Sequence, residues 1–423
     1  MRTRPNLVAS FAFALVVLSA SFSARAQSPG TTWQQQVREL LNRRAAAVVS
    51  GDQRTFLATM ADAPKEFRDD RMTWFRRIRA LPIGVYKLDF TEEEYGELTR
   101  PSDVRKHAGR EVHIVQVKER IGFRGYDTTP TAEDAFLTVV KGPRGWSVVA
   151  DDDVASLALQ TQRHLWDFGP IGKLEGGGVM VVFHPSERSA ASRLLRVMQS
   201  ARARVKRDWP IPWRQDRIVL MIPRTVDELA RILQTTFDLS TFVAFAAISV
   251  DRSTGWRLSG ARIFLHWPNF RRQSEATQRV ILQHELAHKA SFEVSGPNIV
   301  AWMDEGIAQN YGEKGYPHPL PEMRAGIRSG RFDSHLPDDY RFTTGPASDI
   351  YLSYEKADSF TAYLGTRFGN AAGARLYRAV GTENPVDPGT WRYHLDRESR
   401  VLFHIPFTTL ERDWARQAVR ELS

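Results

Sequence analysis

The sequence has 423 residues, of which 42% are hydrophobic and 25% charged, proportions typical of a globular protein with room for two domains. It has no cysteine, which excludes disulfides and a lipid anchor at an N-terminal cysteine. The net charge of +9 has no nucleic-acid-binding motif behind it, so no nucleic-acid partner is expected.

Residues 1–26 have the pattern of a secretory signal peptide. Arg2 and Arg4 precede the apolar run Leu7–Ala20, and Ala24–Ala26 offers an A-x-A cleavage site. The run is short for a membrane span, so an uncleaved anchor is the lesser alternative. Because the leader holds three arginines and no acid, cleavage leaves a net charge of +6. We expect a secreted or extracytoplasmic protein, with electrostatic association with anionic envelope polymers as a further option.

Residues 27–155 are predicted to form an α+β unit. Three helices are expected first, and the hydrophobic period then shifts towards two, which predicts four antiparallel strands. The expected helices are 33–49, 54–60 and 66–80, and the strands are 86–91, 111–121, 132–140 and 146–150. This order, with the ending Gly145-Trp146-x-Val148-x-x-Asp151, resembles the nuclear-transport-factor-like (SnoaL or cystatin-like cone) fold. That fold hosts both enzymes and passive modules, so it leaves the role of this unit open.

Residues 156–175 are expected to be a linker, and residues 176–423 a second unit. Strands and helices alternate in its first half, which predicts a mixed sheet leading into a long helix at 274–295. The expected strands are 179–183, 217–222, 243–250 and 262–267, and the helices between them are 187–209 and 226–235. The second half is expected to be helical, including 359–367, 371–380 and 411–422. The fold class of the whole chain is therefore α+β.

The long helix contains the motif H-E-x-x-H, from His284 to His288. On a helix, two histidines four residues apart project from one face. That spacing lets two neutral imidazoles hold one Zn²⁺ while Glu285 reaches a metal-bound water.

A catalytic zinc usually has a third protein ligand and one open position. A third histidine at 294 is excluded, since the chain has Val294 there. Glu293, Asp304 and Glu305 are the next candidates. Glu293 lies on the same or adjoining helical turns, from which a tripod is hard to close, whereas the break at 295–298 lets a second helix turn back.

The segment Trp302-x-x-Glu305-Gly306-x-Ala308 resembles the W-x-x-E-G-x-A of the gluzincins, the thermolysin-like, aminopeptidase-N-like and looser peptidase MA-like zinc peptidases. The resemblance implies that Glu305 is the third ligand and that Asp304 is not. The short interval between His288 and Glu305 favours the looser group.

The segment Tyr354-x-Lys356-Ala357 is similar to the one that carries the oxyanion-stabilising tyrosine of aminopeptidase-N-like enzymes. The similarity implies a catalytic role for Tyr354, with Tyr351, one helical turn away, as the alternative.

The strand Gly260–Phe264 stands where aminopeptidase-N-like enzymes carry G-x-M-E-N on an edge strand. Ile263 replaces the glutamate that holds a free α-amino group in that family, so we expect an endopeptidase that pairs extended peptides with this edge. Gln309 is a candidate for orienting a ligand. Of the other histidines, only His266 and His335 are candidates for cleft residues, and His113 faces either the interior of the first unit or solvent.

These features predict an exported zinc metallopeptidase acting on peptides or proteins. His284, His288 and Glu305 would hold Zn²⁺, Glu285 would act as general base, and Tyr354 would stabilise the oxyanion. The alternative is a non-catalytic envelope-binding protein on a degenerate zincin scaffold. The retained Glu285 argues against it, because a scaffold needs no general base.

Overall fold

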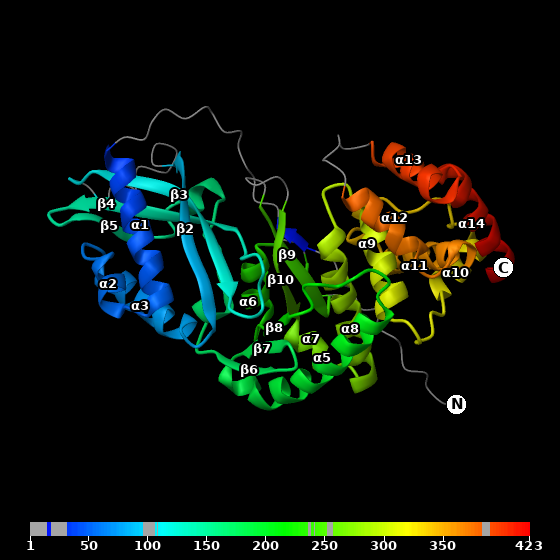
Figure 1. Cartoon of the computed structure of the whole chain (residues 1–423), viewed down its shortest axis with the longest axis horizontal. Coiled ribbons are helices and arrows are strands. Elements are labelled where there is room, and N and C mark those ends of the chain that lie inside the picture. Colours follow the sequence, from blue (N-terminus) through cyan, green and yellow to red (C-terminus); the bar gives the residue numbers. More distant parts are fainter. Residues whose placement is uncertain are drawn as a thin grey trace.

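The computed structural model describes residues 15–17, 32–95, 106–107, 109–235, 238–240, 242–251, 257–382 and 390–423. Within them the chain is a mixed α+β protein with two separate sheets, as predicted. In Figure 1 the four-stranded sheet lies at one end with α1, α2 and α3, the six-stranded sheet lies in the middle, and α9 to α14 lie at the other end.

The first unit contains every element predicted for it. Its helices are α1 (Thr32–Ser50), α2 (Gln53–Ala58) and α3 (Lys65–Ile78). Its strands are β2 (Ile83–Glu94), β3 (Val112–Phe123), β4 (Glu133–Gly142) and β5 (Gly145–Ala150), antiparallel in the order β2-β3-β4-β5. Asp52 caps α2 by accepting a hydrogen bond from the Thr55 amide, and Gly145 makes the β4–β5 turn with a φ of +100°.

The second sheet has the order β1-β9-β10-β8-β7-β6. Its strands are β1 (Leu15–Val17), β6 (Gly172–Gly176), β7 (Val179–Phe183), β8 (Ile218–Ile222), β9 (Ala244–Asp251) and β10 (Arg257–Leu265). The strands β7, β8 and β10 are parallel, and β9 runs antiparallel to β10. Every residue of β7 and β8 is buried, which accounts for their uninterrupted apolar sequences.

The prediction of an edge strand at Gly260–Phe264 is wrong. These residues belong to β10, which pairs with β8 on one side and with β9 on the other. β9 lies nearer the edge of the sheet. Among the described residues, only β1, a strand of three residues, lies beyond it.

Helices α5 (Arg188–Asp208) and α6 (Val226–Leu233) connect strands of this sheet, and the remaining helices follow it. These are α7 (Trp267–Phe270), α8 (Glu275–Ser291), α9 (Ala301–Ile307), α10 (Pro321–Ser329), α11 (Ala347–Phe368), α12 (Ala372–Gly381), α13 (Trp391–Phe403) and α14 (Phe407–Leu422). The helix predicted at 359–367 is the second half of α11, and α10 and α13 were not predicted.

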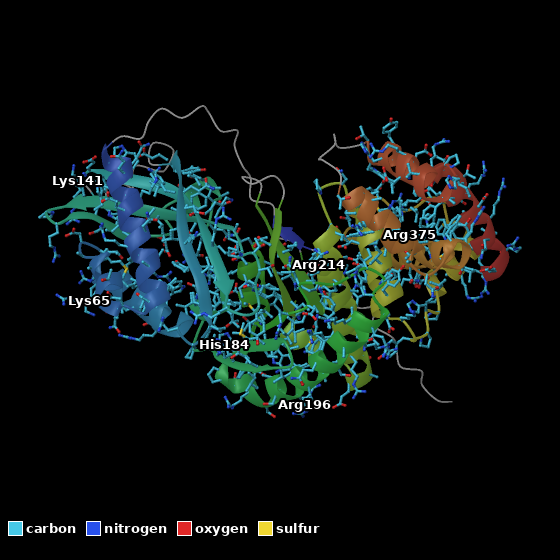
Figure 2. The ribbon with its side chains drawn as sticks, viewed as in Figure 1. Lys65, Lys141, His184, Arg196, Arg214 and Arg375 are labelled. Carbon is cyan, nitrogen blue, oxygen red and sulfur yellow. The ribbon has the colours of Figure 1, made fainter. Side chains whose placement is uncertain are left out.

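The segment 156–175 is not a free connection. Gln162 donates a hydrogen bond to the Ile232 carbonyl (2.6 Å), and His164 Nε2 lies 2.8 Å from Glu119 of β3. His184, labelled in Figure 2, donates from Nδ1 to the carbonyl of Pro170 (2.8 Å). These contacts attach the segment to both sheets.

Among the helices of the described residues, none combines the length and hydropathy required to cross a bilayer. The proposed cleavage site at 24–26 and most of the apolar run before it lie outside the described residues.

Candidate metal centre

Helix α8 carries the H-E-x-x-H motif through the interior of the protein. Ser274 caps its first turn by accepting a hydrogen bond from the Thr277 amide, and every residue from Val280 to Ser291 is buried. The helix packs against β9, α5 and α9. Several of these buried residues are polar, so each needs a partner in the interior.

Three side-chain atoms from α8 and α9 converge in this interior. His284 Nε2 lies 3.2 Å from His288 Nε2 and 3.3 Å from Glu305 Oε2, and the distance from His288 Nε2 to Glu305 Oε2 is 3.5 Å. All three side chains are at most 1% exposed. Among the described residues they form the one group of three side chains able to hold a metal ion.

The spacing fits a tetrahedral ion. Ligand atoms about 2.0–2.1 Å from a tetrahedral centre stand about 3.3–3.4 Å from one another. A facial octahedral set at the same bond length would bring them to about 3.0 Å. Moreover, Glu305 Oε2 is buried and accepts no hydrogen bond from the described residues, which is costly unless a cation occupies the site.

Glycines allow this close assembly. A Cβ on Gly306 would lie 2.5 Å from the Ala357 carbonyl oxygen of α11, and one on Gly312 would lie 2.8 Å from the Cα of His284. Gly306 therefore lets α9 approach α11, and Gly312 lets the segment after α9 approach α8.

Two carboxylates face the outer nitrogens of the histidines. Glu313 Oε1 lies 3.0 Å from His284 Nδ1, and Asp304 Oδ2 lies 3.2 Å from His288 Nδ1. Asp304 Oδ1 in turn accepts a hydrogen bond from Tyr377 (2.9 Å). The hydrogen bond with Glu313 fixes the tautomer of His284 and directs its Nε2 towards the metal site, whereas Asp304 faces His288 Nδ1 at ion-pair distance without hydrogen-bond geometry.

The protonation behaviour of the histidines indicates a site that attracts positive charge. Burial alone disfavours the imidazolium form of His284, yet the neighbouring carboxylates of Glu305 and Glu313 outweigh burial and raise its pKa to about 9. For His288 burial is likewise outweighed by Asp304 and Glu305, which raise its pKa above the usual value. A divalent cation supplies the same positive charge without protons.

Glu285 differs from the other acids of the centre. It is fully buried, and neither of its carboxylate oxygens has a hydrogen-bond partner among the described residues. Burial raises its pKa to about 7, against the opposing effect of His284 and His288. The amide of Ala246 on β9 also favours the charged form but does not reach hydrogen-bond geometry. Such a carboxylate can gain or lose a proton near neutral pH.

Of the two tyrosine candidates, Tyr354 lies closer to the centre. It is 2% exposed, and the negative charges of Glu305, Glu285 and Asp304 add to burial in raising the pKa of its phenol well above the usual value. Tyr351 is half-buried, and the charge that affects it is that of Glu322.

The other candidates lie elsewhere or have other partners. Glu293 accepts hydrogen bonds from the backbone amides of Gln215 and Arg214, the latter labelled in Figure 2. His266 caps α7, and His335 lies 3.5 Å from Glu411 of α14.

Two further candidate residues, Gln309 and His113, are not among the partners of the metal ligands. Gln309 Oε1 is buried without a hydrogen-bond partner among the described residues, and Glu313 holds the ligand instead. His113 stacks on Trp33 with ring centroids 3.8 Å apart.

Comparison with known proteins gives no family for this chain. No protein-family model matches it, and no curated protein matches it.

Proposed function

We propose that this protein is an exported zinc-dependent metallopeptidase of the gluzincin type, with a nuclear-transport-factor-like unit before the peptidase unit. The observation that carries the proposal is the convergence of two imidazole nitrogens and one carboxylate oxygen next to an unpartnered, buried carboxylate. The leader pattern of residues 1–26 supports export.

The donor set supports zinc as the metal. Two imidazoles and one carboxylate with tetrahedral spacing are the ligands of catalytic zinc sites, which leave the fourth position to water. Zinc, when bound, acts as a Lewis acid that lowers the pKa of water from 15.7 to about 7.

Glu285 has the properties of the general base. It takes a proton from the attacking water as the oxygen forms its bond with the scissile carbonyl carbon, and passes that proton to the leaving amine as the C–N bond breaks. The absence of a hydrogen-bond partner among the described residues leaves both of its oxygens available for this transfer. Tyr354, whose raised pKa keeps the phenol protonated, donates a hydrogen bond to the oxyanion.

The composition of β9 supports internal cleavage. β9, whose Ala246 amide lies near Glu285, contributes no acid before Asp251 that could hold a free α-amino group. β10, which contains Ile263, is interior, so β9 is the strand that a substrate can reach.

The test is hydrolysis of casein and of a proteome-derived peptide mixture, with and without a chelator, by the wild type and Glu285→Gln. Chelator-sensitive cleavage that Glu285→Gln abolishes supports the proposal. Stoichiometric zinc with no turnover of any peptide refutes it and supports the non-catalytic binding protein.

A further inference from the structure

A buried ion pair joins the two units at β10. Arg262 donates two hydrogen bonds to Asp127, which follows β3 of the first unit, with both N–O distances at 2.6 Å. Both side chains are 6% exposed. Asp127 also accepts a hydrogen bond from the Phe123 amide, and the Arg262 guanidinium lies over the Phe123 ring. The hydrogen bonding is bidentate and the pair is buried, so it sets the orientation of β10 relative to the first unit as well as the distance between them.

Two further contacts attach the same pair of strands to the first unit. Ser249 of β9 donates a hydrogen bond to Glu133 of β4 (3.1 Å). Gly260 of β10 has a φ of +58°, and a Cβ there would lie 2.9 Å from the Cα of Thr131. This approach requires glycine, both for its backbone angle and for its lack of a side chain.

The opposite face of β9 and β10 lies against the metal centre. Arg262 pairs across the strands with Ala247, and Ile263 pairs with Ala246, so the two pairs point to opposite faces. Ala246 and Ile248 pack with Phe292, which follows α8, and the Ala246 amide lies near Glu285. The strands are thus held between the first unit and the motif helix.

We propose that the N-terminal unit is a support for the peptidase site, and that Arg262 and Asp127 are positioning residues. By holding the face of β9 and β10 that lies opposite the metal centre, the pair sets the distance between the β9 backbone and the carboxylate of Glu285. An extended substrate that takes the place of β1 beside β9 then meets the metal centre in register. This role rests on the proposed peptidase function.

The experiment compares Asp127→Asn with Asp151→Asn in the full chain. Asp151 pairs with Arg163 and Arg71, so its variant removes a similar ion pair without touching β9 or β10. The measurements are hydrogen exchange of the β9 amides, zinc content, and kcat and KM for an N-acetylated peptide, all well below the melting temperature. Ser249→Ala is a milder variant that keeps the test decisive if Asp127→Asn does not fold.

For Asp127→Asn we expect on the order of tenfold faster exchange in β9 and a tenfold higher KM, because losing one partner of a buried pair loosens what it holds. Zinc content and kcat should stay within about twofold of the wild type. Ser249→Ala should change exchange and KM in the same direction by about twofold.

A lower melting temperature with unchanged β9 exchange and unchanged KM in Asp127→Asn overturns the proposal. An equal effect of Asp151→Asn on β9 exchange and on KM also overturns the proposal. A wild type with no turnover refutes the peptidase function instead, and the exchange data then decide the support role alone.

Discussion

Replacing Glu285 with glutamine separates catalysis from metal binding. The side chain contributes no ligand atom to the group of His284, His288 and Glu305, so zinc should remain stoichiometric. General-base assistance is worth about 10²–10⁴-fold, and the same group also returns the proton to the leaving amine, so kcat should fall by about 10⁴-fold or more. Zinc analysis and a peptidase assay on one preparation measure both.

The same variant should change the stability of the metal-free protein in a defined pH window. Burial raises the pKa of Glu285 from 4.5 to about 7, so ionising it opposes folding increasingly as pH rises from 4.5 to 7. A shift of this size corresponds to about 3 kcal/mol, an upper limit because the glutamine amide is buried too. Metal-free Glu285→Gln should therefore unfold at higher urea concentration than the wild type at pH 8 and at a similar one at pH 4.

Near-wild-type turnover by a folded, zinc-loaded Glu285→Gln would refute the role of Glu285. Loss of zinc from the variant would instead show that the carboxylate belongs to the metal shell.

Four further outcomes are expected. Glu313→Gln should weaken zinc binding about 10–100-fold in a chelator competition, because Glu313 orients His284, whereas Glu322→Gln on α10 should not. Tyr354→Phe should lower kcat by about 10²-fold with little change in KM, and an equal loss in Tyr351→Phe would contradict the assignment. N-acetylation of a peptide should leave its cleavage rate nearly unchanged, and strong loss would indicate recognition of a free amino group. Burial of His164 opposes its charged form, but Glu119 outweighs burial and raises the pKa of His164 from 6.5 to about 9. The pair therefore stabilises the fold fully below pH 6.5 and loses its contribution as pH rises through 9. His164→Gln should flatten the fall in urea midpoint over that range.

Local patterns predicted those parts of the centre that depend on one helix. The spacing of His284 and His288 follows from helix geometry, so the sequence was sufficient to place them together. Glu313 was missed because the regular helix α9 ends at Ile307 and continues as a π-helical turn over Ala308–Gly312. The wider turn breaks the four-residue spacing that singled out Gln309. Tyr377 comes from α12, far along the chain, and no spacing rule reaches it.

The order of the strands could not be predicted from the sequence, for a related reason. β10 is buried on both faces, with Arg262 paired inside the protein, and a period-two pattern cannot distinguish an interior strand from an edge strand. Residues 156–175 were taken for a linker because they lack periodicity. Instead, residues 172–175 belong to β6, and the part before them is held by side-chain hydrogen bonds to α6 and β3.

The interior position of α8 has a consequence for how the protein acquires its metal. The two histidines and Glu305 lie close together in the sequence, but Asp304, which faces His288, is held by Tyr377 from much further along the chain. A chain that has not yet folded past Tyr377 lacks the hydroxyl that holds Asp304 beside His288, and in the finished chain the three ligand side chains are at most 1% exposed. Full ordering of the metal site is therefore part of the last stage of folding. Under the export proposed above, the ion is taken from the compartment in which folding ends, and its supply there decides how much metal-loaded protein is formed.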